Sequence, residues 1–134
     1  PIIQCWPDDG DPRTCGYPLS PEQAGTAAGG GRYITLGGVF TIHPDDAGKP
    51  AGVPRPSRNI GMYRAQLVDR KHTAMHWHMH HDGARHWRAW KKLAGGGRPM
   101  PCAIVLGGES VLPSAATAPM PPGISELLFA GFLN

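Results

Sequence analysis

The distribution of glycine and proline most limits the regular structure that this chain can form. The 134 residues include 19 glycines and 15 prolines. Both residue types interrupt helices and strands, because glycine is flexible and proline lacks a backbone N–H. They are concentrated in residues 7–31, 44–56, 95–101 and 113–123. The stretches between are apolar and aromatic enough to fold, so the pattern predicts a small globular domain with long irregular loops.

Hydrophobic patterns in those stretches predict a mixed α+β fold. Residues 33–36 and 39–43 are rich in β-formers and are separated by two glycines, which predicts one kinked strand or a hairpin. Residues 44–57 are predicted to be a loop. Residues 59–69 and 72–80 are predicted to be consecutive strands joined by a tight hairpin. In the second strand, side chains alternate between two faces, with Met75, Trp77 and Met79 on one and His76, His78 and His80 on the other.

The second half of the chain contains two predicted helices and a short strand. Asp82 is a plausible N-cap for a helix that ends at Leu93. Its apolar stripe consists of Ala84, Trp87, Trp90 and Leu93. Residues 103–106 predict a buried strand, and Ser125 could cap a helix that begins at Glu126. The order of elements favours an α+β barrel or sandwich.

Charge and cysteine content exclude several classes of protein. The net charge is +3, and the dense basic group at residues 85–92 is explained by a solvated helix face or a mild anion preference. The sequence lacks the concentrated stripe of basic residues that would predict nucleic-acid binding. Three cysteines without a Cys-x-x-Cys pair favour reduced thiols in the cytoplasm. No apolar run is long enough for a membrane span, and no signal peptide is recognisable.

Six of the seven histidines lie between His72 and His86. Imidazole is a good transition-metal ligand, but the spacing matches no zinc motif. The strand histidines could equally face solvent, pair with carboxylates or contact a partner subunit. His81 differs, because it lies at the predicted strand-to-helix break, where side chains reach a pocket rim.

Several sequence blocks, in this order and spacing, resemble the UbiD-type decarboxylases, which depend on prenylated FMN. The blocks are PIIQCWP (1–7), NIGMYR (59–64), MHWHMHHDGARH (75–86), MPCAIVLGG (100–108) and AATAPMPPGISELLFAGF (115–132). The resemblance covers nearly the whole chain apart from Gly/Pro-rich loops at 14–32 and 45–58. It implies an α+β fold of the split β-barrel type, related to flavin-reductase-like FMN-binding domains, with residues 1–134 forming part of one such domain.

The resemblance also implies a metal site. A divalent cation, typically Mn²⁺ and alternatively Mg²⁺, is held beside the flavin phosphate by residues that match Asn59, His81 and Glu126. Hard divalent cations favour oxygen ligands and accept one imidazole. A K⁺ ion is expected nearby. Residues that match the family's flavin contacts are Gly61, Met62, Tyr63, Arg64, His80, Thr117 and Pro119.

Arg64 matches the active-site arginine of the family, and its guanidinium can pair with a substrate carboxylate. The resemblance implies reversible, non-oxidative decarboxylation of an aromatic or α,β-unsaturated carboxylic acid. The acid/base glutamates and the C-terminal portion that supports homo-oligomerisation have no match here. The sequence starts without Met and ends in an apolar run at 127–133, which predicts a fragment. Because the glutamates have no match, this fragment is expected to be inactive alone.

Two alternatives remain open from the sequence. The histidines could form a non-catalytic metal-binding module for zinc, nickel or copper. The chain could also be the small subunit of a split decarboxylase, completed by a separate protein.

Overall fold

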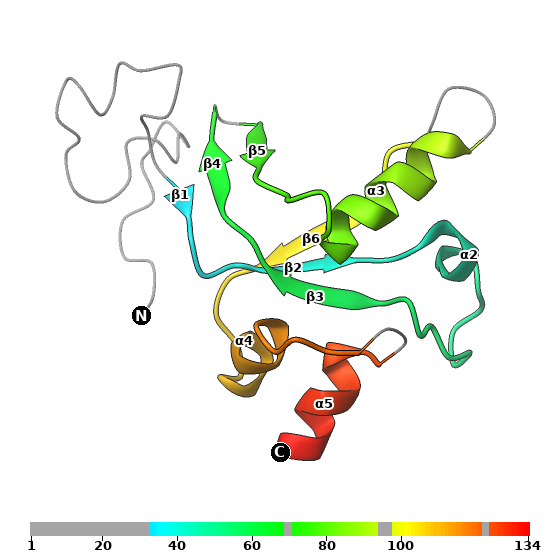
Figure 1. Ribbon diagram of the computed structural model, residues 1–134, viewed down its shortest axis with the longest axis vertical. Helices are drawn as coiled ribbons and strands as arrows, with labels where there is room; N and C mark the ends of the chain where they lie inside the picture. Colours follow the sequence, from blue (N-terminus) through cyan, green and yellow to red (C-terminus); the bar gives the residue numbers. More distant parts are fainter. Residues whose placement is uncertain (1–32, 69–70, 94–97, 122–123) are drawn as a thin grey trace, which may run out of the picture. The chain divides into compact units, whose positions relative to one another are not determined.

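The computed structural model describes residues 33–68, 71–93, 98–121 and 124–134, which fall into two compact units (Figure 1). The small unit comprises residues 1–35 and 64–76, and the large unit comprises residues 36–63 and 77–134. The prediction of a single domain with loops at 14–32 and 45–58 stays a prediction.

The small unit contains a three-stranded antiparallel sheet in the order β1-β4-β5. Its strands are β1 (Tyr33–Ile34), β4 (Ala65–Leu67) and β5 (Thr73–Met75). The Val68 N–H donates to the His72 carbonyl at 3.0 Å and extends the β4–β5 pairing toward the turn. The predicted antiparallel pairing of these two segments is confirmed, while the turn residues 69–70 lie outside the described part.

The large unit contains a second three-stranded antiparallel sheet in the order β3-β2-β6. Its strands are β2 (Gly38–Thr41), β3 (Asn59–Met62) and β6 (Cys102–Val105). Thr41 pairs with both Asn59 and Cys102, so these three residues form one row across the sheet. Opposed residues of antiparallel strands project from the same face.

The predicted strand boundaries are wrong at three places where the chain leaves a sheet. Residues 33–36 and 39–43 form neither one strand nor a hairpin, since β1 and β2 belong to different sheets. Residues 59–69 form two strands, because the chain leaves β3 at Tyr63 and enters β4 at Ala65. Residues 76–80 form no strand, so the predicted alternation of histidines fails beyond Met75.

The strand at 102–105 is an edge strand, which corrects the prediction that it is buried. β6 pairs with β2 alone in the part of the chain that the structure describes. Val105 remains 42% exposed as a result. An apolar run four residues long does not by itself distinguish a central strand from an edge strand.

Helix α3 (Asp82–Lys92) begins one residue earlier than the predicted cap implies. His81 is the N-cap and Asp82 lies in the first turn. The buried side of the helix includes His86 and Trp90, whereas Trp87 is 47% exposed. The predicted stripe was therefore wrong at Trp87, and also at Leu93, which follows the helix and is 36% exposed. It followed hydrophobicity and passed over the histidine that faces the sheet.

The other helices are α2 (Pro44–Ala47), α4 (Val111–Ala116) and α5 (Glu126–Leu133). The first two were not predicted, and α2 occupies the start of the predicted loop 44–57. Ser125 caps α5 as predicted, with its Oγ accepting from the Leu127 N–H at 3.1 Å. Both α4 and α5 contact β3, and α3 contacts the same strand.

These elements confirm the α+β class. The strands of the described residues form two open sheets and no closed barrel, so the split-barrel prediction is not confirmed. No helix within the described ranges is long and apolar enough to cross a membrane.

Candidate functional site

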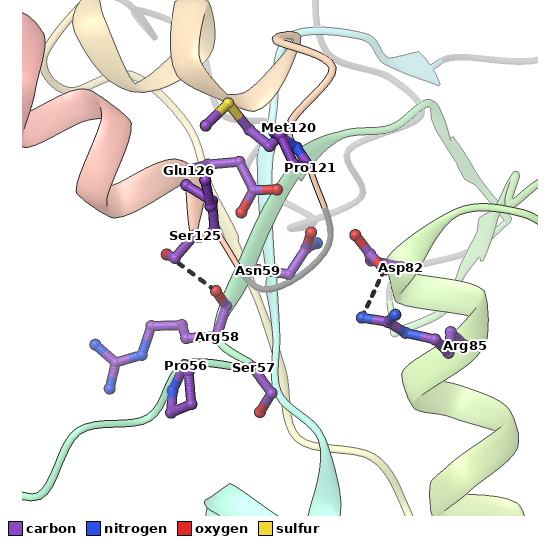
Figure 2. A pocket seen from close by; sticks show the side chains of 11 residues that line it. Pro56, Ser57, Arg58, Asn59, Asp82, Arg85, Met120, Pro121, Ser125 and Glu126 are labelled. Carbon is purple, nitrogen blue, oxygen red and sulfur yellow. Dashed lines mark hydrogen bonds and ion pairs between the residues drawn. The ribbon is translucent and has the colours of Figure 1, made fainter.

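A pocket of about 330 Å³ lies in the large unit, where β3 meets the first turns of α3 and α5 (Figure 2). One wall comes from the segment before β3, and another comes from Met120 and Pro121. The polar residues that line the pocket are Ser57, Arg58, Asn59, Asp82, Arg85, Ser125 and Glu126. Asn59 and Glu126 therefore line one cavity. Both are predicted metal ligands, although they are far apart in the sequence.

Asn59 is the first residue of β3 and is only 6% exposed. Its Nδ2 atom is buried and has no hydrogen-bond partner among the described residues. An unpaired buried donor is unfavourable, typically by about 1–3 kcal/mol, unless a ligand or water pairs with it. The Asn59 amide is therefore a buried polar group that a ligand in the pocket can satisfy.

Glu126 is placed by the start of α5 and by the edge of the sheet. The residue is 9% exposed, and its Oε2 accepts from the Ile60 N–H at 3.2 Å. β3 pairs only with β2 within the described residues, so the N–H groups on its other side are open to bonds with side chains such as Glu126. An ionised carboxylate has several acceptor positions, and Figure 2 shows the Glu126 carboxylate directed toward the Asn59 side of the pocket.

His81, the third predicted ligand, lies beside the pocket lining. It precedes Asp82, which lines the pocket, and its Nδ1 accepts from the His78 N–H at 3.0 Å. A neutral imidazole with an accepting Nδ1 carries its proton on Nε2. A neutral His81 can therefore bind a metal once the His78 N–H releases Nδ1, either through Nδ1 itself or through Nε2 in the other tautomer.

The donor set around the pocket fits a hard divalent cation better than a soft one. Asn59 and Glu126 supply oxygen donors, and Asp82, whose Oδ1 is paired with Arg85 at 2.8 Å, adds a second carboxylate. The described residues contain no group of three or more His, Cys, Asp or Glu side chains arranged to hold a metal. Sequence reasoning missed Asp82 as a pocket residue, although its position next to His81 was a usable signal.

Gly61 shares the face of β3 that carries Asn59, because every second residue of a strand projects the same way, and Tyr63 follows the end of the strand. A Cβ at Gly61 would collide with the ring of Tyr63, so that ring covers the glycine. Burial raises the pKa of the Tyr63 phenol, and the nearby Asn59 side chain and Gly83 N–H offset part of this increase. The predicted flavin contacts of Gly61, Met62 and Tyr63 stay predictions.

The remaining predicted residues lie outside this pocket's lining. Arg64 belongs to the small unit, where its guanidinium lies 5.1 Å from the ring centre of Tyr33. His80 is exposed and its ring stacks on His78 at 6.0 Å. Thr117 ends α4, where its hydroxyl donates to the Ser114 carbonyl at 3.0 Å, and Pro119 is exposed. Their predicted roles are not tested by these positions.

A second polar group, absent from the sequence-based predictions, is buried under the middle of α3. The His86 Nδ1 lies 2.9 Å from the Thr41 Oγ1, and His86 is only 1% exposed. Desolvation lowers the pKa of His86 to about 4, and the positive charge of Arg85 adds to this decrease. His86 is therefore neutral at neutral pH.

Asp46 connects this region to the wall of the pocket. Its Oδ2 accepts from both the N–H and the Oγ of Ser57, at 2.9 and 2.6 Å. Hydrogen bonding from Lys49, followed by that from Ser57, holds the pKa of the Asp46 carboxyl well below its usual range. The Asp46 carboxylate therefore fixes Ser57, which lines the pocket.

Comparisons with known proteins identify relatives of the whole chain. Residues 1–134 match the family model described as UbiD, 3-octaprenyl-4-hydroxybenzoate carboxy-lyase Rift-related domain. An uncharacterized protein of Aquifex aeolicus is 38% identical over 99% of the chain, and one of Archaeoglobus fulgidus is 37% identical over 100%. The chain spans 21% of the length of each of these two relatives.

A solved structure shows the same relationship. The vanillic acid decarboxylase of Sedimentibacter hydroxybenzoicus, in its closed form, superposes with a TM-score of 0.63 and 27% identity. The match covers 75% of this chain and 20% of that one. The chain therefore belongs to the UbiD carboxy-lyase family.

Proposed function

We propose that this chain is the cofactor- and metal-binding part of a reversible, non-oxidative decarboxylase. Its substrates would be aromatic or α,β-unsaturated carboxylic acids, the class to which the substrate named for the vanillic acid decarboxylase belongs. The observation that carries the proposal is the meeting of Asn59 and Glu126 in one pocket. Family membership supports the type of reaction.

Asn59, His81 and Glu126 would hold Mn²⁺ or Mg²⁺ through two oxygen donors and one imidazole. These donors suit a hard cation, and bound phosphate would complete its coordination. Among the polar groups of the pocket, Ser57 and Ser125 supply hydroxyls and Arg58 supplies positive charge. A cation here would reduce the repulsion between Glu126 and a phosphate.

Prenylated FMN, when bound, supplies the electron sink for loss of carbon dioxide. The protein's part is to bind, orient and exclude water. Arg64 carries a planar guanidinium suited to a substrate carboxylate, and a nearby K⁺ would add positive charge. The proton donor and the contacts for homo-oligomerisation would come from sequence beyond the family blocks found here. Such an enzyme would work in the cytoplasm, as the cysteine content predicts.

The test is a metal and flavin analysis of the purified protein, alongside two matched variants. Glu126→Ala removes a carboxylate that lines the pocket. Glu109→Ala removes an exposed carboxylate that does not line it. We expect manganese and prenylated FMN in the parent and in Glu109→Ala, and loss of both in Glu126→Ala.

The contrary result is a flavin-free protein that carries zinc or nickel and is unchanged by Glu126→Ala. That outcome would transfer support to the histidine-rich metal module. The structure gives little support to that histidine-rich module. His76, His78 and His80 are exposed, and the described residues contain no metal-holding cluster of histidines. Co-purification of a second polypeptide that restores activity would instead support the small subunit of a split decarboxylase.

A further inference from the structure

The side chain of Tyr63, the residue that follows β3, lies over Gly61 on the strand face that carries Asn59. Asn59 and Gly61 share one face of β3, and Gly61 has no side chain there. A Cβ at Gly61 would overlap the Tyr63 ring, including its hydroxyl end. The ring thus folds back along the strand toward Asn59, through the space that Gly61 leaves free.

Aromatic contacts fix the ring in that place. The Tyr63 and His81 rings have centroids 5.0 Å apart and are tilted by 36°. Trp77 meets Tyr63 edge to face at 6.0 Å and 87°. Trp77 itself is held close to α3, since a Cβ at Gly83 would lie 2.7 Å from its ring. Tyr63 is therefore packed between two rings at the start of the helix.

The hydroxyl end of Tyr63 lies among the groups of the predicted metal site. Burial raises the pKa of the Tyr63 phenol, as do the charges of Asp82 and Glu126, whereas the nearby Asn59 side chain and Gly83 N–H lower it. One predicted ligand, His81, thus contacts the Tyr63 ring, and another, Asn59, is near enough to the phenol to affect its pKa.

We infer that Tyr63 is a positioning residue, which orients Asn59 through its hydroxyl and His81 through its ring. The inference rests on the proposed metal site. Asn59 Nδ2 has no partner of normal geometry, and a phenol oxygen can accept from it. When Nδ2 turns toward Tyr63, the amide Oδ1 points away from it and is available to a cation. Groups behind metal ligands commonly fix ligand orientation in this way.

The test compares Tyr63→Phe with Tyr33→Phe in the full chain. Each variant loses one phenol oxygen and keeps the ring, but Tyr33 lies in the small unit. Mn²⁺ titration followed by electron paramagnetic resonance measures affinity and the symmetry of the bound ion. We expect Tyr63→Phe to bind Mn²⁺ about 10-fold more weakly with a changed spectrum, as is common for residues behind metal ligands. Tyr33→Phe should match the parent.

Equal affinity and an unchanged spectrum in Tyr63→Phe would overturn the inference and leave the proposed function intact. A second measurement separates the two ideas further. The side-chain amide resonance of Asn59, recorded by nuclear magnetic resonance without metal, should move in Tyr63→Phe and not in Tyr33→Phe. If the parent binds no Mn²⁺, the proposed function fails. In that case, an Asn59 resonance that is unchanged in Tyr63→Phe would overturn the contact between Tyr63 and Asn59. A shifted resonance would support that contact.

Discussion

Thr41 and Asn59 are two buried polar residues on neighbouring strands of one sheet, but they have different surroundings. Thr41 and Asn59 are register partners on β2 and β3, and both are nearly inaccessible to solvent. Thr41 has a hydrogen-bond partner in His86, beneath the middle of the helix. Asn59 lies at the helix start, beside an open pocket, with Nδ2 unpaired. Each group keeps one buried nitrogen without a partner among the described residues, His86 Nε2 and Asn59 Nδ2. Of the two groups, it is Asn59 that lines the pocket, so we expect the His86–Thr41 pair to serve stability and Asn59 to serve binding.

Truncation of His86 should give the largest loss of stability. His86→Ala removes a buried ring and leaves Thr41 without its partner, so we expect the free energy of unfolding to fall by about 3 kcal/mol. Chemical denaturation measures this change. Lys92→Ala, on the exposed surface of the same helix, should change it by less than about 0.5 kcal/mol. A large loss of Mn²⁺ affinity in folded His86→Ala would contradict the assignment of stability to His86 and of metal binding to Asn59.

Acidification should destabilise the fold through the same His86–Thr41 pair, without any mutation. The folded pKa of His86, about 4, lies below its ordinary value of 6.5, so protonation favours the unfolded chain. Stability from the neutral ring is complete above pH 6.5 and is lost as the pH falls toward 4. We expect a loss of about 2 kcal/mol between pH 7 and pH 5.

Denaturation of His86→Gln across the same range is the control, because this variant lacks the imidazole. Its curve should be flatter than that of the parent. The Asp46 pKa is lowered, so that carboxylate stabilises the fold above its ordinary value of 3.8 and loses its effect only in stronger acid. Parallel curves for parent and variant would show that His86 is not the titrating group.

Gly61→Ala should affect both stability and binding at the open site. The new methyl group would collide with the Tyr63 ring, which is held by His81 and Trp77. Overpacking of this kind typically costs about 1–3 kcal/mol. We expect a loss near the middle of that range, together with weaker Mn²⁺ binding. Gly48→Ala is the control, since a Cβ there meets nothing within 4 Å. Wild-type Mn²⁺ binding in Gly61→Ala would show that the ring position does not matter.

Ser125→Ala should have the smallest effect. It removes the side chain that accepts from the Leu127 N–H at the start of α5, and loss of such a cap costs about 1 kcal/mol. Because Glu126 is the next residue, its carboxylate should become less ordered and Mn²⁺ affinity should fall slightly. Ser114→Ala, within α4, provides the matched loss of an exposed serine hydroxyl.

The parts of this structure that local sequence determines were predictable. Ser125 and Glu126 define a helix start through one side-chain hydrogen bond, and the alternation of Asn59 and Gly61 is local to one strand. The convergence of Asn59 and Glu126 was predicted only through family resemblance, because no periodic pattern relates residues so far apart.

Other features depend on partners distant in the sequence. His86 is buried because Thr41 faces it, whereas hydrophobicity alone favoured Trp87 for the inner surface of α3. The place of Tyr63 depends on the end of β3 and on the missing side chain of Gly61. Neither is visible from the composition of a single segment.

The row formed by Asn59, Thr41 and Cys102 fixes the distance between the Cys102 backbone and the Asn59 backbone. Neighbouring strands lie about 4.8 Å apart, so the backbone at Cys102 is roughly 10 Å from that at Asn59. The Cys102 thiol is exposed, although desolvation raises its pKa and should slow its alkylation. A fluorophore attached there, after replacement of Cys5 and Cys15, would be within quenching range of Mn²⁺ at Asn59. Occupancy of the site could then be followed by light emission alone.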